Sequence, residues 1–155
     1  MPNWIEGTLK VRGKRENIRR FFLEGCVILC DSGEKPPEDR SNDSRLWLDF
    51  HGSEDIYIEG TRRAFISCDE VYKEEEEGVI CVNVRQAWAF DGRPGDPDRW
   101  KAISDRFDID IKLFGIERGM EFVQEVIILR EGKNIVNFKT YEDWEWECPF
   151  PCMGG

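Results

Sequence analysis

The chain has 155 residues, 22 of them basic and 32 acidic, so its formal net charge is −10. With 40% hydrophobic and 12% aromatic residues it is too apolar for a disordered chain, and its length predicts one domain over 1–155. The acidic balance argues against a general nucleic-acid binder, and we expect neither a membrane span nor a secretory signal, because long apolar runs are absent.

The first elements are predicted from apolar spacing. Alternating apolar residues predict a strand over 5–12, and Gly13 interrupts the pattern. Gly25 is expected to end the helix that follows, because glycine readily caps a helix C-terminus. That helix covers 14–24 and has one apolar face, formed by Ile18, Phe21 and Phe22.

The middle of the chain alternates apolar runs with a polar segment. A short strand is expected at 27–29, whereas 31–45 contains two prolines without a hydrophobic anchor and predicts a mobile loop. Strand-like patterns return at 45–50, 56–60 and 62–67. We expect this middle part to elaborate a simpler fold.

The second half predicts a strand, a helix and three more strands. A buried strand is expected at 79–90 and a helix at 97–106. Further strands follow at 109–117, 121–132 and 133–142, the last two as a hairpin. Four large aromatic residues are expected in the core: Trp4, Trp88, Trp100 and Phe107.

This order predicts an α+β domain in which two helices pack on one face of an antiparallel sheet. No composition shift divides the chain, and 143–155 reads as a tail.

A series of landmarks in this order resembles the YubB-like family. The landmarks are Asn3-Trp4, Gly13, Ala87-Trp88, Ile103-Ser104, Glu117 and Gly119. The resemblance covers 1–25 and 80–140, while 31–75 does not follow the family and Ile5-Glu6-Gly7 stands where its members usually have Cys-x-Asn. It implies a ferredoxin-like domain carried by phages or plasmids, and no known reaction.

The six cysteines are expected to be free thiols, since no secretory signal is seen. Cys26 and Cys81 lie within apolar runs and predict small core residues. The CxxxC pairs Cys26/Cys30 and Cys148/Cys152 leave a zinc site or redox-sensitive thiols open, although zinc usually takes tighter spacing.

Acidic residues cluster around 69–77 and 142–147, in the second group beside two tryptophans. Such arrays can mimic nucleic-acid charge and occupy a basic groove, and tryptophan often anchors an interface. The competing interpretation is the solvated surface of an acidic protein. The candidate partner-binding residues are Glu74, Glu75, Glu76, Glu77, Trp144, Glu145, Trp146 and Glu147.

One segment has the opposite charge. Residues 10–20 hold six bases and one acid, and the expected helix start could present amides to a phosphate. This predicts an alternative function, an RNA- or nucleotide-binding module, although the same bases could simply balance neighbouring acids. The alternative phosphate-binding residues are Arg12, Lys14, Arg15, Arg19 and Arg20.

No catalytic motif is present, and His51 is the single histidine. We therefore predict no catalysis, no cofactor and no metal, with a metal-dependent nucleic-acid-processing enzyme as the rival. By analogy with small acidic proteins of mobile elements, we expect an inhibitor in the host-cell cytoplasm that blocks a host defence protein. The leading partner is a CRISPR effector nuclease, which would make the chain an anti-CRISPR-type protein.

Overall fold

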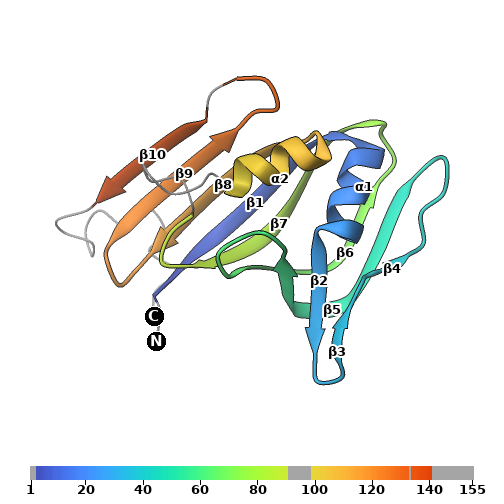
Figure 1. Cartoon of the computed structure of the whole chain (residues 1–155), viewed down its shortest axis with the longest axis horizontal. Helices are drawn as coiled ribbons and strands as arrows, with labels where there is room; N and C mark the ends of the chain where they lie inside the picture. Colours follow the sequence, from blue (N-terminus) through green and yellow to red (C-terminus); the bar gives the residue numbers. More distant parts are fainter. Residues whose placement is uncertain (1–2, 91–98, 133, 141–155) are drawn as a thin grey trace.

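The computed structural model describes residues 3–90, 99–132 and 134–140, and it has the predicted α+β class (Figure 1). Two helices accompany ten strands in these residues. In chain order the elements are β1 (Trp4–Lys14), α1 (Arg15–Glu24), β2 (Cys26–Cys30), β3 (Gly33–Lys35), β4 (Glu38–Asp39), β5 (Leu46–Ile58), β6 (Ala64–Lys73), β7 (Glu77–Ala87), α2 (Arg99–Phe107), β8 (Asp110–Glu117), β9 (Phe122–Ile128) and β10 (Ile135–Thr140).

All the strands belong to one sheet whose neighbours are antiparallel. Their order is β10-β9-β8-β1-β7-β6-β5-β2-β3, and β4 pairs with β5. The first strand is therefore central, with β7 and β8 on either side. The predicted hairpin at 121–142 is confirmed as the β9–β10 pair at one edge of the sheet.

The core lies between the helices and the sheet. On β1, Ile5, Leu9 and Val11 are buried, whereas the intervening Lys10 and Arg12 are exposed, so one face of the central strands stays open. The helices bury their predicted apolar faces, which are Ile18, Phe21 and Phe22 on α1 and Trp100, Ile103 and Phe107 on α2. The Phe21 and Phe107 rings are 5.7 Å apart and join the two helices.

The middle segment differs from the prediction in two places. The strands expected at 45–50 and 56–60 form a single strand, β5, whose register with β6 shifts at Ser53. The apolar alternation is interrupted there because His51 and Gly52 adopt positive φ values of 55° and 66°. The segment 31–45 carries the short strands β3 and β4, where the sequence predicted only a loop.

The predicted core needs two corrections, both on β7 or just after it. Cys81 is exposed, because the strand is buried on one face only and Cys81 lies on the open one. Trp88 follows the strand with a φ of 71° and is 53% exposed. Trp100, Phe107 and Cys26 are buried as predicted, and Trp4 is half-buried.

Candidate functional site

The half-buried side chain of Arg15 joins two turns that are far apart in sequence. Its guanidinium donates to the backbone oxygens of Ser44 at 2.9 Å, Asp43 at 2.6 Å and Glu74. It also pairs with the Glu76 carboxylate at 3.1 Å, and its side chain is 15% exposed. Arg15 is thus a clamp between the turn before β5 and the turn between β6 and β7.

The clamp joins two turns that carry four acidic side chains, and a fifth, that of Glu77, follows at the start of β7. We call Asp43, Glu74, Glu75, Glu76 and Glu77 the acidic ridge. All five are exposed, and the Glu75 and Glu76 side chains are 73% and 70% exposed. Four of them are predicted partner-binding residues, and the structure adds Asp43, 31 residues before Glu74.

The acidic ridge keeps a net negative charge. The Glu75 carboxylate pairs with Lys73 at 2.9 Å, and this hydrogen bond lowers the pKa of Glu75. The Glu74 carboxylate accepts a hydrogen bond from the Tyr72 hydroxyl, which raises the pKa of Tyr72. Within the described residues, Arg15 and Lys73 form ion pairs with the ridge and Lys14 lies opposite Glu77 in the strand register. Five acids and these three bases give a formal charge of −2.

The other candidate phosphate-binding residues are mostly engaged with acids. Arg19 pairs with Glu16 at 3.1 Å and with Asp39, and the hydrogen bond to Asp39 is the largest cause of its raised pKa. Arg20 lies 3.6 Å from Glu24. Lys14 is exposed at the end of β1, where it pairs in register with Glu77. The structure therefore brings the basic segment and the acidic run together.

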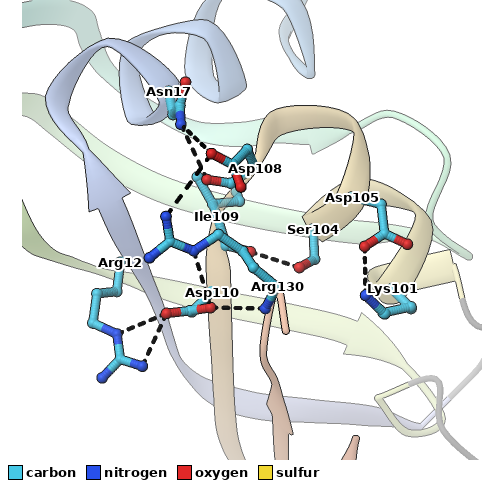
Figure 2. A network of polar contacts seen from close by, with 9 residues as sticks. All are labelled: Arg12, Asn17, Lys101, Ser104, Asp105, Asp108, Ile109, Asp110 and Arg130. Atoms are coloured by element: carbon cyan, nitrogen blue, oxygen red, sulfur yellow. Dashed lines mark hydrogen bonds and ion pairs between the residues drawn. The ribbon is translucent and has the colours of Figure 1, made fainter. Parts of the chain in front are cut away.

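Arg12 on β1 belongs to a network around Asp108 and Asp110 that also includes Asn17 on α1 and Arg130 after β9. Figure 2 shows Arg12 and Arg130 reaching the Asp110 carboxylate from different elements, at 2.9 Å and 3.3 Å. Asp110 also accepts the backbone N–H of Arg130 at 2.8 Å. Burial alone would raise the pKa of Asp110, but these donors outweigh it and lower the pKa.

His51 lies in the group of three potential metal ligands found in the described part of the chain. The other two are Glu38 and Asp49. The Arg40 guanidinium lies 3.0 Å from each carboxylate, so a divalent cation would have to displace it. The arrangement is that of an exposed ion-pair cluster, not of an open cation site.

The remaining predicted partner residues are Trp144, Glu145, Trp146 and Glu147, and all four lie outside the described residues. The same holds for Cys148 and Cys152. Among the cysteines with described positions, Cys26 is buried and Cys30 is exposed.

Neither a protein-family model nor a curated protein nor a solved structure matches the chain. No helix in the described ranges is long and apolar enough to cross a membrane. One member of the acidic ridge, Asp43, is not recognisable from the sequence. Asp43 is an isolated acid in a polar loop, and no local pattern shows that Arg15 will hold it beside Glu74.

Proposed function

We propose that this chain is a mobile-element inhibitor that binds and blocks a host defence protein in the host cytoplasm through its acidic ridge. The leading partner is a CRISPR effector nuclease, whose nucleic-acid channel must be basic. The observation that supports this most is the Arg15 clamp, which fixes the backbone of two acidic turns in one arrangement. A fixed array of carboxylates loses less conformational entropy on binding than a flexible one.

The resemblance to the YubB-like family supplies the mobile-element part of this proposal. Its ferredoxin-like implication is supported by strand order. In that fold two βαβ units interlock, so that each pair of parallel strands has one strand of the other unit between its members. Here β7-α2-β8 encloses β1 in this way, whereas three strands, β7, β6 and β5, separate β1 from β2.

We accordingly regard the fold as a ferredoxin-like core with two extra strands inserted by the middle segment. Figure 1 shows α1 and α2 in front of the sheet, the placement that such a core requires.

The experiment is a plaque assay in cells that carry one defined defence system each, either a CRISPR effector nuclease or a restriction enzyme. We expect expression of the chain to raise phage plating by at least tenfold in one of these strains. Replacing the four consecutive ridge acids by glutamine should remove the effect. The substitutions are Glu74→Gln, Glu75→Gln, Glu76→Gln and Glu77→Gln.

A matched control removes the same charge elsewhere. It carries Glu34→Gln, Glu59→Gln, Glu121→Gln and Glu131→Gln at four exposed acids for which the described residues provide no ion pair. This control should inhibit like the wild type. Equal activity of both variants, or no protection of phage in any strain, would contradict the proposal.

The two tryptophans test the second part of the predicted interface. If Trp144 and Trp146 are anchors, replacing them by alanine should speed dissociation from the partner, whereas the ridge variant should mainly slow association. Unchanged dissociation would remove them from the interface while leaving the ridge proposal intact.

A further inference from the structure

The two edges of the sheet differ in how well they are protected against pairing with another strand. At one edge, β3 is only three residues long, Gly33–Lys35, and two of the three are charged. Short and charged edge strands are a usual protection against pairing between sheets. At the other edge, β10 has six residues without an acid or a proline, and Lys139 is its single charge. β10 therefore lacks the protection that β3 has.

All six side chains of β10 are exposed, and three of them are large and apolar. Val136 and Phe138 lie on the face of the sheet that carries the helices, since they pair in register with the buried Val126 and Gln124. Ile135 lies on the opposite face. In the described part of the chain, no strand pairs with the outer side of β10. The outward backbone groups of such an edge are a template for another strand.

The apolar surface continues from β10 towards the end of β7. The Phe138 ring lies 4.5 Å from the Phe122 ring, and both line a hollow of about 430 Å³ together with Trp88 and Met120. Figure 1 shows this edge of the sheet beyond α2. Of the eight exposed large apolar residues in the described ranges, five lie on or beside β10: Trp88, Met120, Ile135, Val136 and Phe138. A concentration of exposed apolar side chains is typical of a protein–protein contact.

Charge favours a second copy of the chain as the occupant of this edge. Each copy has a formal charge of −10, so two copies repel each other wherever their acidic surfaces meet. β10 contains no acid, and the one acid of the neighbouring β9, Glu125, is paired with Lys112 at 3.0 Å. Two copies can therefore approach each other along β10 without bringing unpaired acids of these strands together.

The sequence of β10 is also complementary to itself. In an antiparallel pair of two β10 strands centred on Asn137, Val136 lies opposite Phe138 of the second copy. Ile135 then lies opposite Lys139, whose aliphatic stem can cover it. Apolar side chains thus face each other across the pair and no like charges are opposed, which is the pattern that stabilises neighbouring strands.

We propose that the chain forms a symmetric dimer in which the β10 strands of two copies pair antiparallel and join their two sheets into one. The same patch is used by both copies, as two-fold symmetry requires. The contact is separate from the acidic ridge, so the dimer presents two ridges and can form whether or not the chain inhibits a defence protein. Interfaces of one edge strand are small and transient, and we expect a Kd of about 10–100 μM.

The first test is sedimentation equilibrium of the full chain between 1 and 300 μM. We expect the mass to rise with concentration from the monomer mass of 18.2 kDa towards twice that value. Dimerisation should be tighter at 300 mM than at 50 mM salt, because salt screens the repulsion between two acidic copies. A mass of 18.2 kDa at every concentration would overturn the proposal, and the edge would then be covered by residues 141–155 or by another protein.

The second test changes the charges that face each other in the proposed register. Val136→Glu with Phe138→Glu opposes like charges and should weaken dimerisation by at least tenfold. Val136→Lys with Phe138→Glu opposes unlike charges in both pairs, and it should dimerise at least tenfold more tightly than the double glutamate variant.

The matched control is Leu29→Glu with Val79→Glu, which adds the same charge at exposed apolar positions on β2 and β7. It should dimerise within twofold of the wild type. Equal weakening in this control and in the double glutamate variant would show that the contact does not use β10. Urea unfolding at 1 μM, where the chain is monomeric, confirms that each variant keeps its fold.

The third test maps the two-fold axis by cross-linking. Directly opposite residues of antiparallel strands have Cα atoms about 4.5–5.5 Å apart, which a disulfide can bridge. Asn137→Cys should therefore form a disulfide between copies on mild oxidation, identified by mass spectrometry of the linked peptides. The two copies of Lys139→Cys lie four residues apart along the pair, about 13 Å, and should not be linked. Linkage of the second variant and not of the first would refute the proposed pairing.

Discussion

The Arg15 clamp makes the most specific prediction about stability. Arg15→Ala removes three hydrogen bonds from a charged donor to the turn carbonyls and one ion pair with Glu76. A hydrogen bond that involves a charged group contributes about 1.5–3 kcal/mol, and such contributions are not additive within one cluster. Because the turns lie at the surface, their carbonyls can regain water, and we expect a total loss of about 3 kcal/mol.

Arg15→Lys keeps the positive charge but lacks the planar guanidinium, whose several N–H groups reach both turns at once. It should therefore lose about half as much stability as the alanine variant. Arg20→Ala is the control, since the contacts of the Arg20 side chain with described residues are an exposed pair with Glu24 and the Phe107 ring. It should lose at most about 1 kcal/mol.

Urea unfolding measures these losses, and thermal unfolding provides a second estimate. For a chain of this length, 3 kcal/mol corresponds to about 6–12 °C in Tm. If Arg15→Ala is no less stable than Arg20→Ala, other contacts hold the two turns together, and the Arg15 clamp does not explain the arrangement of the acidic ridge. A lysine variant that matches the wild type would likewise refute the role of the fork.

Three further predictions concern the sheet, pH and thiols. Gly7→Ala should lower the free energy of unfolding, measured in urea, by about 3 kcal/mol or more, because the added Cβ would lie 1.9 Å from the Phe114 carbonyl oxygen. The neighbouring control, Thr8→Ala, should lower it by about 1 kcal/mol at most. The pKa of Asp110 is lowered in the folded chain, so the stability that the ionised carboxylate contributes is complete above its unfolded pKa of about 3.9 and disappears as pH falls through the folded pKa. In urea unfolding, the loss of stability in Asp110→Asn should therefore be full at pH 7 and become smaller towards pH 3. A loss that stays constant with pH would contradict this. Burial raises the pKa of Cys68 to about 12, and Cys26 is buried, whereas Cys30 and Cys81 are exposed. Mass spectrometry should therefore find Cys30 and Cys81 alkylated by iodoacetamide at pH 8, while Cys26 and Cys68 react only after unfolding. Rapid reaction of Cys68 in the folded chain would contradict this.

The local elements were predictable because each has a clear apolar period. Ile18, Phe21 and Phe22 share one helix face whatever the rest of the chain does, and the β9–β10 hairpin needs only adjacent strands. The continuity of β5 was not predictable in this way. Positive φ values at His51 and Gly52 interrupt the alternation, although the strand itself continues.

The sequence pattern also could not predict which side chains of β7 are exposed. Val79 and Cys81 look like core residues, and only the position of both helices decides which face of the strand is covered.

The candidate site was half predictable for a related reason. A run of glutamates is visible in the sequence, but its rigidity depends on Arg15, which lies 59 residues before Glu74 in the chain. The basic segment suggested phosphate binding because its acidic partners lie elsewhere in the sequence, Asp39 20 residues after Arg19 and Asp110 98 residues after Arg12. Only the folded chain shows that these charges largely satisfy each other.

The central claim is that the acidic ridge makes the contact that blocks a defence protein. The most direct measurement is the association rate with the defence protein identified in the plaque assay, at 50 mM and 200 mM salt. We predict that the four-glutamine ridge variant associates at least tenfold more slowly than the wild type at 50 mM salt and loses most of the salt dependence, while the matched control stays within twofold. Equal association rates for the ridge variant and the control would contradict the claim.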